Sequence, residues 1–263
     1  MGHDHEGQRV SRRRLITGVS SIGLGGLLAA CAKAEGTTTV ATAAITPRAA
    51  TAGDVTALFA EARTCRMTAD VTQGPFYFDA DLVRSDIREG RPGVRLRVAI
   101  KVQDGRTCRP LPNAVVEIWH CDANGLYSGA EALSAAGPLS AGFKPLDNGE
   151  FADMKPADGT RYLRGAQVTN ADGIVEFTTV WPGWYHGRTI HIHAMVHIAD
   201  QRALTTQLMF DETLNREVMA TRPYARRTGR TVFNEADEDF DPSMLMKTVP
   251  DGDGYLSAIT LST

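Results

Sequence analysis

Val94-Arg95-Leu96-Arg97-Val98-Ala99-Ile100-Lys101-Val102 alternates apolar and polar side chains with a period of two. Successive side chains of a β-strand point to opposite faces, so the aliphatic residues share one face, and Arg95, Arg97 and Lys101 share the other. A strand of this kind is buried on one side only. The stretch therefore predicts a sheet that lays one face on an apolar core.

Further segments rich in β-branched and aromatic residues predict more strands. They cover residues 114–119, 174–180, 189–198, 205–210 and 255–261. Turn dipeptides stand between them, namely Asp104-Gly105, Asn124-Gly125, Asp172-Gly173 and Pro182-Gly183. Short helices are expected only at 54–63 and 212–220, and an acidic loop is expected around 235–241. Several strands with few helices predict an all-β protein, specifically a β-sandwich.

The overall charge gives no sign of a nucleic-acid partner. The formal net charge of the 263 residues is −3, whereas nucleic-acid binding is typically accompanied by a basic surface. The proportion of hydrophobic residues, 43%, is ordinary for a soluble globular protein. Composition alone names no substrate.

The first 31 residues have the layout of a twin-arginine export signal. Arg12, Arg13 and Arg14 precede an apolar run that is shorter than the roughly 20 residues needed to span a bilayer. The run ends in Leu28-Ala29-Ala30-Cys31, which resembles a bacterial lipobox with Cys31 as the lipid-modified residue. A signal cleaved without lipidation is the alternative. We expect a periplasmic or cell-surface protein whose membrane contact is a lipid anchor at Cys31.

The remainder of the chain divides into a tether and a folded domain. Residues 32–53 are dominated by Ala and Thr and predict a tether, and residues 54–263 form the expected domain. This part holds Cys65, Cys108 and Cys121, and an oxidising compartment permits a disulfide. Cys108 and Cys121 flank a predicted turn and strand, which favours pairing them. The sequence also leaves Cys65 open as a partner of either.

A predicted strand over residues 189–198 carries histidines on one face. His191 and His193 are two residues apart, so both side chains point the same way, with Cα atoms roughly 6.5–7 Å apart. That separation lets both imidazoles reach one metal ion. Two histidines on an ordinary polar sheet face are the alternative. His197 continues the row, and an ordinary surface or supporting histidine is expected there.

Two tyrosines lie in loops beside these predicted strands. Tyr185 belongs to the loop Trp181-Pro182-Gly183-Trp184-Tyr185-His186-Gly187-Arg188, which leads into the histidine strand. Tyr127 closes the run 117–127, where a predicted strand ends in a turn. A single tyrosine is more often a packing residue than a ligand. Together with His-x-His, the two tyrosines form a coherent set.

This set resembles the intradiol ring-cleavage dioxygenases, the family of catechol 1,2- and protocatechuate 3,4-dioxygenases. The resemblance covers about residues 65–210. Its motifs are Gln73-Gly74-Pro75-Phe76-Tyr77, the run from Trp119 to Tyr127, Pro182-Gly183-x-Tyr185, Arg188-x-x-His191-x-His193 and Thr206-Gln207-Leu208-x-Phe210. The fold that it implies is a β-sandwich, in agreement with the strand pattern.

The resemblance implies a role for each motif residue. Its ferric-iron ligands are Tyr127, Tyr185, His191 and His193, and Tyr185 is the tyrosine that leaves the metal when the catechol binds. Arg188 and Gln207 are expected to line the substrate pocket, with Arg188 stabilising charge on the bound ring. Tyr77 is expected either at the pocket mouth or as a structural aromatic of its turn. Each of these assignments comes from the resemblance, except that of Tyr77.

This chain also departs from the family's best-studied enzymes. The loop from Tyr185 to His191 is shorter, and His120-Cys121-Asp122 follows Trp119, where those enzymes carry other residues. These changes fit a subgroup of exported members and leave the substituents of the catechol open. The oligomeric state is left open as well.

The implied chemistry suits these residue types. Fe(III) is a hard cation that favours phenolate and imidazole ligands over thiolate. With O₂ as co-substrate, one ferric ion per chain would open a catechol between its hydroxyls and give a muconate-type dicarboxylate. Two other classes are considered: a metal-free β-sandwich that binds aromatic or carbohydrate ligands, and a zinc or copper site built from His191, His193 and His197.

Overall fold

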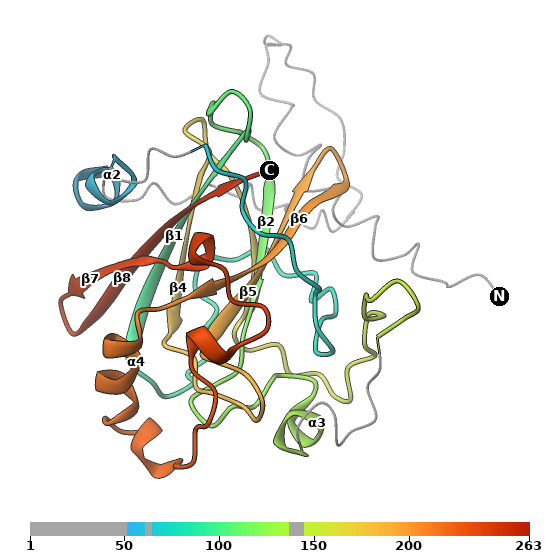
Figure 1. Cartoon of the computed structure of the whole chain (residues 1–263), viewed down its shortest axis with the longest axis vertical. Helices are drawn as coiled ribbons and strands as arrows, with labels where there is room; N and C mark the ends of the chain where they lie inside the picture. The colour runs from blue at the N-terminus through green and yellow to red at the C-terminus, as the bar shows by residue number, and fades with distance from the viewer. Residues whose placement is uncertain (1–51, 61–64, 137–144) are drawn as a thin grey trace, which may run out of the picture. The chain divides into compact units, whose positions relative to one another are not determined.

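The computed structural model describes residues 52–60, 65–136 and 145–263, arranged around two β-sheets (Figure 1). The export signal, Cys31 and the tether lie outside the described residues, apart from the last residues of the tether. One four-stranded sheet has the order β4-β1-β8-β7, and the other has the order β3-β2-β5-β6. Aliphatic residues from both sheets form one core cluster. The predicted β-sandwich is confirmed.

The first sheet is built around the strand predicted from residues 94–102. Its strands are β1 (Arg95–Gln103), β4 (Ile174–Val180), β7 (Lys247–Asp251) and β8 (Gly254–Ser262). β1 pairs antiparallel with β4 and parallel with β8. The aliphatic face of β1 is buried, while Arg97 on the other face pairs with Glu176 at 2.8 Å. The predicted alternation of this strand is therefore confirmed.

The second sheet carries the predicted histidine strand. Its strands are β2 (Val115–Trp119), β3 (Arg164–Val168), β5 (His191–Ile198) and β6 (Gln201–Met209). All of its neighbouring strands are antiparallel. Ile192, Ala194 and Val196 of β5 enter the core, so the opposite face of β5 carries the histidines. β3 and β7 are absent from the sequence prediction, and β6 begins four residues earlier than predicted.

Helices within the described residues are few and short. They are α2 (Ala52–Ala60), α3 (Glu131–Ala136), α4 (Glu212–Met219) and the single-turn 3-10 helices η1 (Tyr224–Arg226), η2 (Asn234–Ala236) and η3 (Pro242–Met244). Val55 and Phe59 of α2 pack on Ala99, Leu256 and Ala258 of β1 and β8. Asp211 caps α4 by accepting from backbone N–H groups of its first turn. Among the described helices, none is long and apolar enough to cross a membrane.

The disulfide joins Cys65 to Cys108, with Cα atoms 5.4 Å apart, and Cys121 is free and buried. The predicted pairing of Cys108 with Cys121 is therefore wrong. Cys108 precedes β2 and Cys121 follows it, so the two lie at opposite ends of a strand. Five residues of strand span about 17 Å, far beyond the reach of a disulfide.

Candidate metal centre

Strand register brings four polar or aromatic residues into one row across the second sheet. Trp119 lies opposite Arg164 on one side and opposite His193 on the other, and His193 lies opposite Gln207. Residues directly opposite in a sheet point to the same face. His191, two residues from His193, shares that face. The row therefore collects on the side of the sheet that faces away from the aliphatic core.

Nitrogen and oxygen atoms of the predicted ligands converge beside this row. The Nε2 atoms of His191 and His193 are 3.1 Å apart, and the Tyr185 hydroxyl lies 3.3 Å from His191 Nε2. The ring centroid of Tyr127 is 5.6 Å from that of Tyr185 and 6.2 Å from that of His193. All four side chains are at most 2% exposed. The structure thus brings together the four residues predicted as ligands.

The spacing of these atoms suits a shared metal ion. Ligand atoms about 2.1 Å from one ion, at angles between 90° and tetrahedral, lie about 3.0–3.4 Å from one another. The buried hydroxyl of Tyr127 has no hydrogen-bond partner of good geometry among the described residues. A buried polar atom without a partner is costly. A cation held by His191, His193 and the two tyrosines would satisfy it.

Hydrogen bonding fixes which nitrogen of His191 faces this point. Its Nδ1 lies 2.9 Å from the carbonyl oxygen of Thr189. A carbonyl oxygen can only accept, so Nδ1 carries the proton and Nε2 presents a lone pair. The ring of His193 stacks on Trp119, with centroids 4.9 Å apart and planes 3° from parallel. Both imidazoles are therefore held in fixed orientations.

Burial sets the charge of the four groups when no cation is bound. Burial lowers the pKa of His191 and of His193 well below the ordinary value, so both imidazoles are neutral at pH 7. Burial also raises the pKa of Tyr127 and raises that of Tyr185 to about 12. Both tyrosines are then neutral phenols. A cation that takes them as phenolates must displace both protons.

Arg188 enters this region from the loop before β5. Its Nε pairs with Asp237 at 3.0 Å and its Nη2 pairs with Asp239 at 2.8 Å. The same Nη2 donates to Gln207 Oε1 at 2.7 Å. Asp237 also accepts from the backbone N–H of Thr189 at 2.7 Å, so it ties Arg188 to the start of the histidine strand. The sequence predicted an acidic loop here and did not predict its contact with Arg188.

Tyr77 and His197 belong to a neighbouring polar cluster on the same sheet face. The Tyr77 hydroxyl donates to Glu117 Oε2 at 3.0 Å, and His197 Nε2 lies 3.3 Å from Glu117 Oε1. His197 is therefore not part of the His191 and His193 pair. Nowhere in the described part of the chain do three His, Cys, Asp or Glu side chains form a metal-binding group. Beside the two histidines, the nearest further oxygen donors of the converging set are the tyrosine hydroxyls.

His120, Cys121 and Asp122 follow β2 and are all buried. His120 uses Nδ1 towards the carbonyl oxygen of Cys121 and Nε2 towards the hydroxyl of Thr179. Burial lowers the pKa of His120 to about 4, so it is neutral at pH 7. Asp122 pairs with Arg91. Each of the three has a structural partner, since the Cys121 thiol lies 3.4 Å from the Gly183 carbonyl oxygen.

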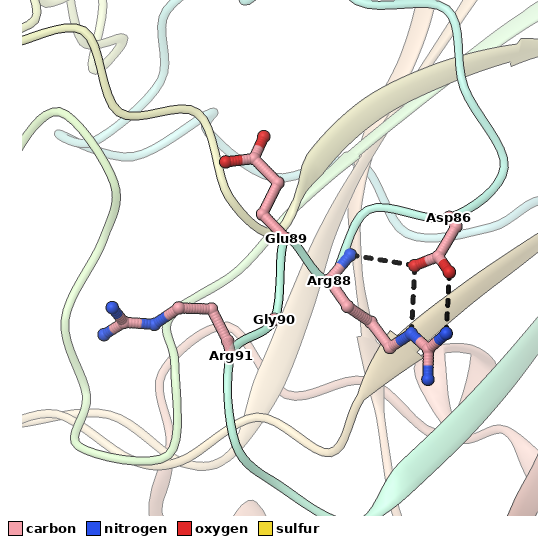
Figure 2. Close-up of a pocket in the computed structure, with 5 residues that line it drawn as sticks. All are labelled: Asp86, Arg88, Glu89, Gly90 and Arg91. Atoms are coloured by element: carbon pink, nitrogen blue, oxygen red, sulfur yellow. Dashed lines mark hydrogen bonds and ion pairs between the residues drawn. The ribbon is translucent and has the colours of Figure 1, made fainter.

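A surface hollow lies elsewhere, along the segment 86–91 (Figure 2). Arg88 is held there by Asp86, with Nη2 2.7 Å from Oδ2, and Arg91 pairs with Asp122 outside the hollow. Glu89 and Gly90 complete its lining. Its two arginines already have carboxylate partners, and none of its residues belongs to the converging set.

Comparison with known proteins identifies the family. A family model described as a dioxygenase matches residues 72–239. Chlorocatechol 1,2-dioxygenase of Rhodococcus opacus is 28% identical over 153 residues, which are 55% of this chain and 56% of that protein. Catechol 1,2-dioxygenase 1 of Acinetobacter lwoffii is 30% identical over 117 residues, 38% of this chain and 30% of that protein. This chain thus spans about half of the first relative and about a third of the second.

Solved structures agree. An intradiol ring-cleavage dioxygenase from Tetranychus urticae has a TM-score of 0.66 and 33% identity, covering 75% of this chain and 94% of its own. The dioxygenase domain of a dioxygenase carbohydrate-binding protein fusion from Streptomyces sp. SirexAA-E has a TM-score of 0.52 and 27% identity, covering 75% and 98%. The chain belongs to the intradiol ring-cleavage dioxygenase family, whose members are oxidoreductases.

Proposed function

We propose that this chain is a non-haem Fe(III) dioxygenase that cleaves a catechol-type ring between its two hydroxyls, with O₂, to a muconate-type dicarboxylate. The observation that carries the proposal is the convergence of three donor atoms. His191 Nε2 lies within 3.3 Å of both His193 Nε2 and the Tyr185 hydroxyl. The buried hydroxyl of Tyr127, which has no partner of good hydrogen-bond geometry among the described residues, would supply the fourth donor.

The donor set supports iron over softer metals. Two phenols and two imidazoles suit a hard ferric ion, and the buried Cys121 thiol is not among them. When bound, the ferric ion would draw electron density from the catecholate and make the ring reactive towards O₂. Because His191 and His193 are neutral, they can bind without first losing a proton.

Tyr185 is suited to take a proton from the substrate. The metal-free phenol has a pKa of about 12, raised chiefly by burial. A Tyr185 oxygen that is not bound to a metal would therefore hold a proton firmly at neutral pH. The Tyr185 oxygen would be the acceptor for one catechol hydroxyl proton. No Asp or Glu base is needed at this step.

Arg188 would offset the negative charge that builds up as the ring reacts with O₂. Asp237, Asp239 and Gln207 bind its Nε and Nη2, and none of these contacts uses its Nη1. The held guanidinium can then present Nη1 to the substrate without reorganising. Gln207 joins Arg188 to the row that carries His193.

Aromatic side chains exclude water around this point. Phe76 stacks on Tyr127 with ring centroids 4.7 Å apart and meets Tyr185 edge to face at 5.8 Å. Trp119 covers one face of His193. In such a water-poor site, electrostatic interactions are stronger than in bulk water. Tyr77 stays a proposed pocket residue, with its hydroxyl held by Glu117.

We propose in addition that residues 1–31 direct export by the twin-arginine route and that Cys31 carries a lipid anchor. The arginine run and the lipobox-like Leu28-Ala29-Ala30-Cys31 support this. Fractionation of cells that express the whole chain tests both parts. Cys31→Ser should move the protein from the membrane fraction to the soluble periplasmic fraction. Lysines in place of Arg12, Arg13 and Arg14 should retain it in the cytoplasm.

The test of the enzyme proposal is the visible spectrum of the iron-loaded protein, before and after catechol is added without O₂. We expect a phenolate-to-iron charge-transfer band that shifts with catechol and is lost when Tyr127→Phe and Tyr185→Phe are combined. Admitting O₂ should yield a muconate-type dicarboxylate, identified by mass. A protein that stays colourless after ferric iron is supplied would contradict the proposal and favour a metal-free binding module.

A further inference from the structure

Arg164, the first residue of β3, is a buried cation without a carboxylate. It is 2% exposed, and none of the ion pairs within the described residues includes it. Its Nε donates to Ser128 Oγ at 2.9 Å, and its Nη2 donates to the carbonyl oxygens of Phe76 and Ser128 at 2.9 and 3.0 Å. Its Nη1 is buried and finds no partner within the described part of the chain. A buried charge of this kind is costly unless something negative lies nearby.

Two other arginines that reach into the protein have carboxylate partners. Arg97 pairs with Glu176, and Arg188 pairs with Asp237 and Asp239. The two tyrosines of the candidate site therefore have unequal surroundings. The cation that enters beside Tyr185, Arg188, is neutralised by two carboxylates. The cation beside Tyr127, Arg164, is not.

The position of Arg164 connects it to Tyr127 and to the sheet row of His193. Its guanidinium lies over the ring of Phe78, 4.0 Å from the centroid, and 5.9 Å from the centroid of Tyr127, near the outer limit of a cation–π contact. Its hydrogen bonds hold the segment of Phe76 and the residue that follows Tyr127. It thereby fixes Tyr127 against the row in which Arg164, Trp119 and His193 stand.

We propose that Arg164 is a positioning residue that holds Tyr127 among the iron ligands, and that its unpaired charge makes the two tyrosine ligands electronically unequal. The inference rests on the proposed ferric site. A fixed positive charge beside Tyr127 stabilises the electrons of its phenolate. More energy is then needed to transfer one of them to iron, so the Tyr127 band lies at shorter wavelength than it would without Arg164.

The experiment separates the two tyrosines before Arg164 is changed. In a Tyr185→Phe background, the charge-transfer band of the iron-loaded protein comes from Tyr127 alone. In a Tyr127→Phe background it comes from Tyr185 alone. Arg164→Gln is then made in each, because glutamine can still donate to the carbonyl oxygens but carries no charge. We expect the Tyr127 band to move to longer wavelength and the Tyr185 band to stay.

Arg161→Gln is the matched control. Arg161 also lies over the ring of Phe78, at 4.7 Å, but its side-chain hydrogen bonds go to its own loop. It should leave both bands in place. Arg164→Gln should also weaken iron binding roughly 10- to 100-fold, as loss of a group that supports a ligand does. In the metal-free protein, the melting temperature of the Arg164→Gln variant should fall below that of the Arg161→Gln variant.

Each outcome of the experiment either supports or overturns the proposed role of Arg164. A Tyr127 band that Arg164→Gln leaves at its original wavelength overturns the inference, even if iron content falls. If Arg164→Gln holds no iron, the Arg164→Lys variant replaces it in the test, because lysine keeps the positive charge and loses the forked guanidinium. A Tyr127 band that stays in place in Arg164→Lys supports the inference. A Tyr127 band that moves in Arg164→Lys overturns it. If the parent protein shows no phenolate band with iron, the proposed function fails, and the inference fails with it.

Discussion

The two sheets share a core but differ in what covers their outer faces. Outward side chains of the β4-β1-β8-β7 sheet include Arg97, which pairs with Glu176 and Asp251 near the surface. Outward side chains of the β3-β2-β5-β6 sheet include Arg164, Trp119 and His193, all of which are at most 2% exposed. The first outer face carries ion pairs and the short helix α2, and the second lies under aromatic loops.

This difference shows how one strand pattern can serve two purposes. Alternation turns every second residue outward in both sheets. Loops that carry Phe76, Tyr127 and Tyr185 cover only the second sheet, where they form one buried cluster with Trp119. Polar residues under such a cover lose water and must find partners within the protein. The candidate metal centre is therefore a property of the covered outer face, and the core between the sheets supplies stability.

The largest expected effect comes from a comparison of two neighbouring residues of β5, His193 and Ile192. His193→Leu should abolish iron binding and lower activity roughly 1,000-fold or more, because the metal contributes several kcal/mol to the chemistry. Ile192→Ala, on the core face of the same strand, should lower the free energy of unfolding by about 2–5 kcal/mol and keep the iron spectrum. Iron content, activity and urea unfolding of both variants provide the measurements.

The reverse pattern would break the comparison between the two faces. If Ile192→Ala lost iron while it remained folded, the outer face would depend on the core in detail. If His193→Leu lost several kcal/mol of stability in the metal-free protein, the row across β3-β2-β5-β6 would be structural first. Circular dichroism of the metal-free variants separates these outcomes from simple misfolding.

The disulfide should stabilise the fold without affecting the site. It joins Cys65 to Cys108, 43 residues apart, and a loop of that length gives up to about 4 kcal/mol in the chain-entropy model. The segment after Cys65 then bonds to both sheets, through Thr68 to Ser262 and through Val71 to Thr205. Replacing both cysteines by serine should lower the free energy of unfolding by about 2–4 kcal/mol and leave the charge-transfer band unchanged.

Cys121→Ala is the control for that double variant. Cys121 lies beside the aromatic cluster and has no part in the disulfide. It should cost less stability than the double variant, since it removes one small buried side chain. A band that shifts when the disulfide is removed would show that the N-terminal segment also shapes the site, and it would blur the division between the two outer faces.

The parts of the molecule that could be predicted from sequence are those set by local periodicity. β1 and β5 were predicted because their apolar residues alternate, and the alternation of β5 also placed His191 and His193 on one face. β2 was predicted because it is rich in β-branched and aromatic residues. β3 was missed because Arg-Gly-Ala-Gln-Val has only one β-branched residue and is buried on both faces. β7 was missed because it contains Pro250 and is largely exposed.

The parts that could not be predicted depend on contacts between distant segments. Asp237 reaches Arg188 across 49 positions, and Arg164 reaches Phe76 across 88. Neither Asp237 nor Arg164 belongs to the sequence motifs that resemble the family. The disulfide was mispredicted for the same reason, since the fold brings Cys65 to Cys108 and places Cys121 at the far end of β2. In the sequence, Arg164 is followed by the small residues Gly165 and Ala166, and its burial becomes visible only in the fold.

Asp237 offers a smaller test at the edge of the covered face. Asp237→Asn keeps the shape but removes the charge that holds Arg188, so we expect iron to be retained and activity to fall roughly 10- to 100-fold. Asp239→Asn changes a more exposed carboxylate, so its activity should fall less than that of Asp237→Asn. Burial alone would raise the pKa of Asp237, but hydrogen bonds from Arg188 lower it below the ordinary 3.8.

That direction fixes the pH dependence. A carboxyl with a lowered pKa keeps its pairing at every pH above its ordinary value and loses it as pH falls through the lowered one. The Arg188–Asp237 contribution to activity should therefore be constant from neutral pH down to the ordinary 3.8. Profiles of the parent and of Asp237→Asn should run parallel over this range. If the two profiles converge between pH 5 and pH 7, a range centred about two units above the ordinary pKa of Asp, the pairing of Arg188 with Asp237 is contradicted.

The smallest expected effect comes from a comparison of two glycines that have the same backbone φ angle. Gly74 and Gly90 both have φ +72°, where a side chain is strained. A Cβ on Gly74 would lie 3.2 Å from His193 Cε1, whereas a Cβ on Gly90 would meet nothing within 4 Å. Alanine at either position should lower the free energy of unfolding by about 1–2 kcal/mol. Gly74→Ala alone should also shift the charge-transfer band, because it presses on a ligand. Equal spectra for the two variants would mean that the cover over His193 yields to a methyl group, and that the rigidity of the site comes from the sheet row beneath it.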